Sequence, residues 1–329
     1  MKLMQNTMIG AALAFWLGLV ASTATADSAF GYKHELDIVY GQGTISPDGV
    51  SIERDLLLDV YLPSHEVDGS LRPAVVLVHG GAHLRGGRRQ PPFREEGAVH
   101  SRMEDYARML APLGYVSFVI EYRLAQEMPV PKTQPGDPGL IPVEEAVSDL
   151  ALERVNFARN SMGLPRIAPN ERKQVWDAVI AGAEDTAKAI NFIRQNAEQW
   201  SVDPNRIAVG GHSAGAGNTL NATFGLKSPV AAVFPMSPPT MIFSEEQVIS
   251  GSGLPATLLI VSGNDIGVVL AGARRVIPFF RKVDLDFQFA WVPGFPHFYP
   301  SGAPTLADDG SKMSVGERIT EFLDTHLKN

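Results

Sequence analysis

Alternating and continuous apolar runs predict two kinds of β-strand along this chain. Residues 35–41 (ELDIVYG) and 56–62 (LLLDVYL) alternate apolar and polar side chains, as antiparallel strands with one wetter face do. Short continuous apolar runs instead favour parallel strands that are buried on both faces. These runs are residues 74–78, 115–120 and 206–210, with two further candidates at 256–262 and 287–292.

Helical periodicities lie between the predicted strands. Apolar residues recur at steps of three and four in residues 103–110, 179–200 and 315–327, which is typical of amphipathic helices. The alternation of strands and helices predicts a single α/β domain over residues 27–329. We expect a mostly parallel central sheet of about eight strands with helices on both faces.

Residues 127–175 interrupt this alternation. The segment holds seven prolines around a short helical pattern near Val147 to Phe157, and proline at that density prevents a continuous strand or a long helix. A long irregular insertion in a compact domain often acts as a lid over a site, and a plain surface excursion is the alternative. As a lid, the segment would cover a pocket without a core of its own.

The N-terminal segment and the composition restrict location and partners. Residues 1–26 have the form of a secretory signal peptide, with an apolar run over residues 9–20 and the small-residue sequence Ala24-Thr25-Ala26. We therefore expect an exported protein, periplasmic or secreted, without stable membrane insertion after cleavage; an uncleaved anchor is the alternative. The net charge of −8 gives nucleic acid no reason to bind. The lack of cysteine excludes disulfides, thiol catalysis and cysteine metal ligands.

The strongest chemical signal is the sequence Gly211-His212-Ser213-Ala214-Gly215, which fits G-x-S-x-G. It follows the predicted strand 206–210 and precedes a helical run, so the serine lies at a sharp strand-to-helix turn. Such a turn holds the serine in a strained backbone conformation, and the glycines two residues before and after it avoid steric clashes. We therefore predict Ser213 as a catalytic nucleophile.

A second glycine-rich turn follows the predicted strand 74–78. The sequence His79-Gly80-Gly81-Ala82 allows backbone N–H groups to point into a cavity with no side chains in the way, as an oxyanion hole requires. We predict that the N–H groups of Gly81, Ala82 and Ala214 form this hole. His79 itself is predicted to hold the loop by hydrogen bonds.

Chain order selects the catalytic base. Folds with this kind of elbow place serine, acid and histidine in that order along the chain, and six of the eight histidines precede or adjoin Ser213. His326 lies in the predicted C-terminal helix, which leaves His297 in the loop after the predicted strand 287–292. Loops at the carboxyl ends of parallel strands carry the sites of such folds, so we predict His297 as the base.

The acid must lie between the serine and the histidine. Asp265 follows the predicted strand 256–262 at its carboxyl end. The other acidic candidates are Glu245, Glu246, Asp284 and Asp286. The two glutamates fit the first turn of a helix, and the two other aspartates precede the next strand, which places them at the opposite edge of the sheet. We therefore predict Asp265 as the acid.

These motifs resemble those of the α/β-hydrolase superfamily, and more narrowly its secreted or bacterial esterase/lipase branch with an HGG oxyanion loop. The resemblance runs from about Leu57 to Leu327. Its motifs are LDVYLP, HGGA, GY-x6-YRL (Gly114 to Leu124), DP-x-RIAVGGHSAG (Asp203 to Gly215) and a closing Gly-x-x-His. The chain looks closest to the small exported esterases that include feruloyl and acetyl-xylan esterases. It departs from them at Ala82, where only the backbone N–H is used, and at Leu84, where relatives often carry an aromatic residue.

The resemblance implies a serine-dependent carboxylic ester hydrolase that acts through an acyl-enzyme. Its substrates would be small-molecule esters with small, medium or aromatic acyl groups, and ester groups on polysaccharide are a further class. We expect no cofactor and no metal. A serine peptidase or amidase of the same fold and a catalytically inactive binding module are the alternatives.

Two further groups of side chains border the motifs, and each has two interpretations. The basic group comprises Arg85, Arg88, Arg89 and Arg94. It forms either a solvated loop or a site for an anionic group of the substrate. The aromatic group comprises Phe295, Phe298 and Tyr299. It either lines the substrate pocket or packs in the core.

Overall fold

The computed structural model of the protein describes residues 25–27, 31–65, 69–95, 97–249, 253–283 and 285–328. The predicted signal peptide, residues 1–26, lies outside these ranges except for its last two residues. The acidic candidate Asp284 also lies outside them. Within these ranges, no helix combines the length and the apolar character that crossing a membrane requires.

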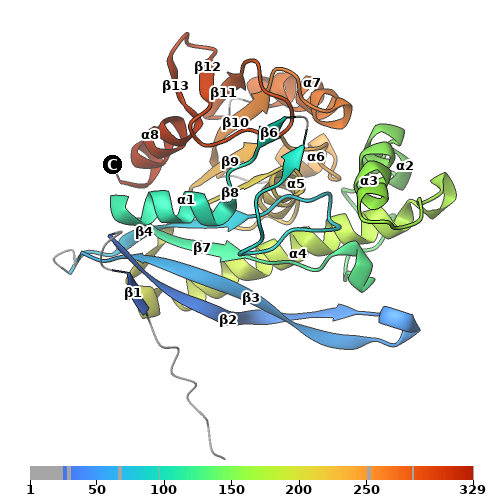
Figure 1. Ribbon diagram of the computed structural model, residues 1–329, viewed down its shortest axis with the longest axis horizontal. Coiled ribbons are helices and arrows are strands. Elements are labelled where there is room, and N and C mark those ends of the chain that lie inside the picture. The colour runs from blue at the N-terminus through green and yellow to red at the C-terminus, as the bar shows by residue number, and fades with distance from the viewer. Residues whose placement is uncertain are drawn as a thin grey trace, which may run out of the picture.

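An eleven-stranded sheet forms the centre of the molecule (Figure 1). Its strands are β1 (Thr25–Asp27), β2 (Tyr32–Ile45), β3 (Ile52–Pro63), β4 (Arg72–Val78), β7 (Val116–Ile120), β8 (Val202–His212), β9 (Ala232–Met236), β10 (Ala256–Ser262), β11 (Phe287–Val292), β12 (Pro304–Ala307) and β13 (Lys312–Ser314). Their spatial order is β1-β2-β3-β7-β4-β8-β9-β10-β11-β12-β13. A separate two-stranded sheet pairs β5 (Arg94–Glu95) with β6 (Ala98–Val99).

Parallel strands occupy the middle of the large sheet, and antiparallel strands extend it at both ends. β7, β4, β8, β9, β10 and β11 run parallel to one another. β1, β2 and β3 add antiparallel strands at one end, and β12 and β13 do so at the other. The predicted α/β class and parallel centre are confirmed, but the sheet is larger and more antiparallel at its ends than predicted.

The central strand β9 was missed by the sequence analysis. It has only five residues, and Pro235 lies inside it. Proline has no N–H to donate to a strand ladder, so it argues against a central strand. Pro235 nevertheless pairs with Gly211 of β8, whereas the ladder between β9 and β10 pairs Ala232, Val233 and Met236.

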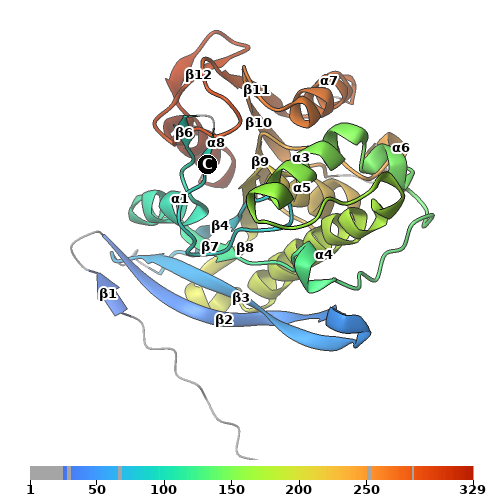
Figure 2. The same cartoon turned by 45° about the vertical axis from the view of Figure 1, so that its right-hand side comes forward.

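Helices cover both faces of the sheet, as predicted (Figure 1 and Figure 2). The helices are α1 (Met103–Leu110), α2 (Val143–Ala146), α3 (Asp149–Ser161), α4 (Lys173–Gln195), α5 (Ala214–Leu220), α6 (Glu245–Ile249), α7 (Gly267–Lys282) and α8 (Val315–Leu327). The short 3-10 helices are η1 (Pro47–Gly49), η2 (Ala111–Leu113), η3 (Ala125–Glu127), η4 (Pro169–Glu171) and η5 (Ala197–Trp200), and a π-helix, η6 (Asn221–Gly225), continues α5. Helices α1 and α8 share one apolar core with the sheet, and α4, α5 and α7 share another on the opposite face.

The insertion 127–175 carries α2, α3 and η4, and its apolar side chains share a cluster with residues outside the insertion. Leu152, Val155 and Ala158 are buried on one side of α3 and pack with Trp176 of α4. The cluster also includes Leu84, next to the predicted oxyanion loop. The insertion therefore packs against α4 and the predicted oxyanion loop. The prolines lie outside α3 and leave its helical spacing of apolar residues intact.

The register of the parallel strands gathers their carboxyl ends at one edge. Val78 at the end of β4 pairs with Gly211 near the end of β8, and His212 pairs with Met236 at the end of β9. Met236 in turn pairs with Ile260 near the end of β10. The loops that follow these strands therefore begin side by side, as parallel α/β sheets require for a site at this edge.

Candidate functional site

Ser213 occupies the sharp turn between β8 and α5. Its backbone has φ 56° and ψ −119°, a conformation that non-glycine residues adopt at a cost of about 1–3 kcal/mol. A Cβ at Gly211 would lie 2.6 Å from the carbonyl oxygen of Val78, and one at Gly215 would lie 2.1 Å from the same atom. Only glycine fits at these two positions, because the strand β4 passes directly behind the turn.

The three side chains predicted as a triad form one hydrogen-bonded chain. His297 Nε2 lies 2.8 Å from Ser213 Oγ, and His297 Nδ1 lies 2.6 Å from Asp265 Oδ1. Ser213 is half-buried, whereas His297 and Asp265 are buried. The geometry gives Ser213 a base within hydrogen-bond distance, and that base is held by a carboxylate.

The other acidic candidates lie elsewhere. The backbone oxygen of Asp286 accepts a hydrogen bond of 2.8 Å from Thr257 N, at the start of β10, so this residue is at the edge opposite to Ser213. Glu245 and Glu246 begin α6, as expected for first-turn acids. His326 lies in α8, with its Nδ1 3.7 Å from a carboxylate oxygen of Asp286.

The glycine-rich loop after β4 passes beside Ser213. A Cβ at Gly80 would lie 3.2 Å from Ser213 Cβ, and both Gly81 (φ 125°) and Ala82 (φ 58°) have positive φ. Within the described ranges, the backbone N–H groups of Gly81, Ala82 and Ala214 donate to no protein acceptor. These N–H groups are therefore available to a ligand near the serine.

Two buried histidines hold this loop. His79 Nδ1 donates to the carbonyl oxygen of Gly80 (2.8 Å), and the ring stacks on Tyr122 with 4.4 Å between centroids. His83 Nε2 donates to Asn218 Oδ1 (2.8 Å). Burial lowers the pKa of each histidine to about 4, so both stay neutral near pH 7 and act as hydrogen-bonding groups of the loop.

His212, the residue before the serine, contacts the backbone of the predicted base. Its Nε2 donates to the carbonyl oxygen of His297 (3.0 Å). Its ring lies 4.0 Å from that of His100, centroid to centroid, and burial lowers the pKa of His100 to about 3. Neither residue has a role that the sequence predicts, because nothing in the local sequence indicates which loop they face.

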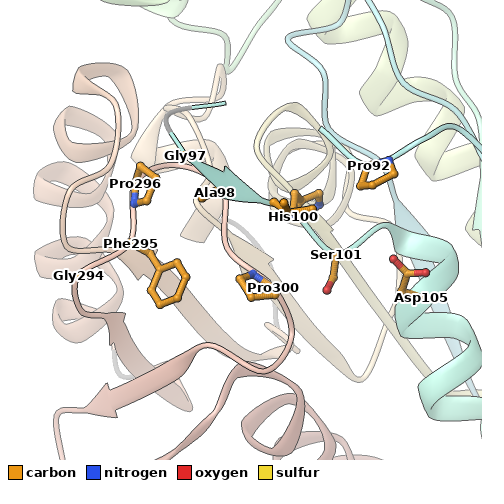
Figure 3. A pocket seen from close by; sticks show the side chains of 11 residues that line it. Pro92, Gly97, Ala98, His100, Ser101, Asp105, Gly294, Phe295, Pro296 and Pro300 are labelled. Carbon is orange, nitrogen blue, oxygen red and sulfur yellow. The ribbon is translucent and has the colours of Figure 1, made fainter. Parts of the chain in front are cut away.

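A cavity of about 540 Å³ lies beside the loop that carries His297 (Figure 3). His100, Ser101 and Asp105 form part of one wall, and Phe295, Pro296 and Pro300 line the other. The cavity is also lined by Pro92, Gly97, Ala98, Val99 and Gly294. Of the three aromatic residues near His297, Phe295 faces this cavity, whereas Phe298 and Tyr299 are buried in the protein.

The arginine group next to the oxyanion loop is largely paired with carboxylates. Arg88 is 8% exposed and contacts Asp37, Asp59 and Glu121. Arg89 also contacts Asp37 and Asp59. Arg85 pairs with Glu95, and Arg94 is exposed. A solvated loop is therefore wrong for Arg88, which instead joins the loop to β2, β3 and the end of β7.

Comparisons with known proteins agree with this architecture. The model of the BD-FAE family matches residues 167–231, which include Ser213. The chain is 26% identical over 138 residues to the non-reducing polyketide synthase prhL of Penicillium brasilianum. That match covers 42% of this chain and 4% of the synthase, so the chain spans a small part of that curated relative.

Solved structures share the fold. Esterase Est2 of the Planctomycetes species Thermogutta terrifontis, with propionate bound, is 18% identical, with a TM-score of 0.50 and coverage of 80% of this chain and 84% of that chain. The same esterase phosphoramylated by tabun gives a TM-score of 0.51 at 18% identity, with the same coverage. Together with the strand order, these similarities show that the chain adopts the α/β-hydrolase fold.

Proposed function

We propose that this protein is a serine-dependent carboxylic ester hydrolase. The observation that supports it most directly is the hydrogen-bonded chain from Ser213 through His297 to Asp265. This chain lies beside a loop whose N–H groups have no protein acceptor in the described residues. A nucleophile, a held base and free donors in one place are the requirements of acyl transfer.

Catalysis would begin when Ser213 Oγ attacks the ester carbonyl carbon and His297 Nε2 takes the serine proton. Asp265 orients the imidazole and stabilises its cation. His297 then returns the proton to the leaving alcohol, which forms the acyl-enzyme. In the second half, His297 takes a proton from water as the hydroxide attacks the acyl carbonyl, and it gives that proton to Ser213 Oγ as the acid leaves.

The oxyanion of each tetrahedral intermediate would face the N–H groups of Gly81, Ala82 and Ala214. One such donor is worth about 10²–10³ in turnover. The positive φ of Gly81 and Ala82 turns the backbone of this loop away from the extended path of β4. The backbone conformation therefore supports these groups as the oxyanion hole.

The substrates we propose are small-molecule esters with small, medium or aromatic acyl groups. The cavity next to the His297 loop combines the Phe295 ring and proline faces with the hydroxyl of Ser101 and the carboxylate of Asp105. Its volume of about 540 Å³ is within the usual range for small-ligand sites. Neither Ser213 nor His297 lines it, so it would hold a part of the substrate away from the reacting carbonyl. Ester groups on polysaccharide remain a second proposed substrate class.

We also propose that the protein is exported to the periplasm or the medium.

The insertion 127–175 is proposed as a lid that limits which acyl or alcohol groups enter. Arg154 of α3 donates to Glu95 at 2.8 Å. Its guanidinium carbon lies 5.8 Å from the ring centroid of Phe298, whose centroid is 5.0 Å from that of His297. The insertion thus approaches the loop of the proposed base, where it could select substrates without taking part in the chemistry.

Replacement of the serine tests the proposal. Ser213→Ala should abolish hydrolysis of p-nitrophenyl acetate while the protein stays folded, because alanine removes only the attacking hydroxyl. Near-normal turnover by the folded variant would refute it. A p-nitroanilide assayed in parallel separates the ester hydrolase from a peptidase or amidase, and a wild-type protein inactive on both would indicate a binding module.

A further inference from the structure

The second oxygen of the Asp265 carboxylate faces a buried serine that the triad does not include. Ser237 Oγ donates to Asp265 Oδ2 at 2.5 Å. Ser237 is fully buried and follows β9 directly, with φ 50°. Its N–H donates to the carbonyl oxygen of Ile260 in β10 at 2.7 Å. The position of its hydroxyl is therefore set by two neighbouring strands of the sheet.

The direction of the hydrogen bonds around Ser237 follows from its single hydroxyl hydrogen. An ionised carboxylate only accepts hydrogen bonds, so the Ser237 hydrogen points to Asp265. Tyr299 OH lies 3.1 Å from Ser237 Oγ and must then be the donor of that contact. Burial raises the pKa of Tyr299 well above its ordinary value, so the phenol keeps the hydrogen that it donates.

The same turn also contacts the nucleophile. The carbonyl oxygen of Met236 accepts a hydrogen bond of 2.9 Å from Ser213 N. The next residue, Ser237, supplies the hydroxyl that donates to Asp265. The left-handed conformation of Ser237 costs free energy for a non-glycine residue. Glycine would remove that strain but would also remove the hydroxyl from Asp265.

We propose that Ser237 is a positioning residue that orients Asp265 toward His297, and that Tyr299 supports it by holding the Ser237 hydroxyl. The proposal rests on the proposed function, because it concerns how the acid of that reaction is held. The two side chains extend the chain of hydrogen bonds from Ser213 to Tyr299. Neither contacts the reacting atoms, so their effect passes through Asp265 and should appear in kcat.

Substitutions at both positions test this arrangement with p-nitrophenyl acetate. A hydrogen bond to a charged group is worth enough that Ser237→Ala should lower kcat about tenfold to hundredfold, with KM within about twofold of the wild type. Ser237→Gly removes the same hydroxyl and also relieves the backbone strain. Its kcat should therefore fall as much as that of Ser237→Ala, even if its Tm differs. Tyr299→Phe should lower kcat by less.

The double variant distinguishes a relay from two independent effects. Because Tyr299 acts through the Ser237 hydroxyl, Tyr299→Phe should have little further effect in the Ser237→Ala background. Two matched controls are Ser117→Ala and Tyr106→Phe. Both residues are fully buried, and their hydroxyls have no hydrogen-bond partner among the described residues. These controls should keep the wild-type kcat.

The outcomes separate this inference from the proposed function. If Ser213→Ala keeps its activity, the ester hydrolase mechanism itself fails. If Ser213→Ala is inactive but folded Ser237→Ala or Ser237→Gly keeps the wild-type kcat, only the positioning role fails. Additive losses in the double variant, or equal losses in the two controls, would also overturn it, because either result means that general packing is responsible.

Discussion

Two buried aspartates in this molecule have opposite surroundings. Asp185, on α4, is contacted by Arg123 through its backbone N (2.9 Å), its Nε (2.9 Å) and its Nη2 (2.8 Å). Asp265 is instead contacted by the backbone N–H groups of Ser262 and Ile266, besides Ser237 and His297. Among the described residues, no arginine or lysine forms an ion pair with Asp265.

The difference indicates what each carboxylate can do. A guanidinium compensates the charge of Asp185 permanently, and Arg123 also donates to the carbonyl oxygens of Thr44 and Val130. This pair therefore joins α4, the β2–β3 hairpin and the start of the insertion. The donors around Asp265 hold its orientation without cancelling its charge, so that charge is available to an imidazolium formed during the proposed reaction.

The largest expected effect is the loss of activity on substitution of Asp265. Asp265→Asn should reduce kcat by about 10³–10⁴, because the amide cannot stabilise the imidazolium and favours the wrong tautomer of His297. Steady-state kinetics on a folded variant measure this loss. Asp286→Asn is the matched control at the opposite edge of the sheet, and a larger loss there would contradict the assignment of the acid.

Asp185→Asn should show the reverse pattern. Removing one partner leaves the Arg123 guanidinium, which is 3% exposed, without its main counter-charge, and the free energy of unfolding should fall by about 3 kcal/mol. The kcat of the folded variant should not change. Denaturant unfolding and p-nitrophenyl acetate kinetics check the two parts. A loss of kcat at unchanged stability would contradict the structural role of Asp185.

An apolar replacement of the whole pair sharpens this test. Arg123→Met combined with Asp185→Leu removes both charges of the pair, and Glu184, which also contacts Arg123 at 3.4 Å, keeps the backbone N–H groups of Lys132 and Thr133. The double variant should therefore recover much of the stability that Asp185→Asn loses. The same unfolding experiment measures it. Stability as low as that of the single variant would mean that the hydrogen bonds of Arg123 to the backbone matter more than its charge.

Acidification should lower the stability of the protein through a third kind of buried group, the histidines without a carboxylate partner. They are His79, His83, His100 and His212, and burial lowers the pKa of each below 6.5. A lowered pKa means that the unfolded chain binds the proton first. The contribution of these neutral histidines to the free energy of unfolding is therefore fully present above pH 6.5. It falls as the pH drops toward 4, by about 1.4 kcal/mol per pH unit for each histidine.

Chemical unfolding at several pH values between 4 and 6.5 measures this slope. His83→Gln keeps a donor near Asn218 Oδ1 but cannot titrate. It should therefore reduce the slope of the free energy of unfolding against pH by the contribution of one histidine. A free energy of unfolding that does not change with pH in this window would show that the histidines are protonated in the folded protein.

The smallest expected effect concerns the insertion. Arg154→Met removes the ion pair with Glu95. It should change the ratio of kcat/KM between a longer or aromatic ester and the acetate ester by about threefold, since such ion pairs contribute about 0.2–1 kcal/mol. Arg159→Met, on the same helix, is the control, because its side chain donates to Pro165 O within the insertion. An unchanged ratio, also after shortening of residues 127–175, would remove the lid role.

The sequence alone was sufficient for the fold class and for finding Ser213, His297 and Asp265. The glycines around Ser213 are required by the sharp turn and by the backbone of β4 behind it. Because this requirement falls on fixed positions around the serine, it is visible as a pattern of five consecutive residues. Chain order and the position of a residue after a parallel strand then select the other two side chains. Their catalytic roles stay predictions, but the distances of 2.8 Å and 2.6 Å that join the three residues agree with the selection.

Only the tertiary structure decided the surroundings of these residues. Ser237 follows a strand that its own proline obscures, and its partners Asp265 and Tyr299 are 28 and 62 residues away along the chain. The sequence around Arg88 is typical of an exposed loop, yet Arg88 lies among three carboxylates from β2, β3 and the end of β7. Hydrogen bonds and ion pairs depend on which strands become neighbours, and that order is set by packing of the whole sheet rather than by local sequence.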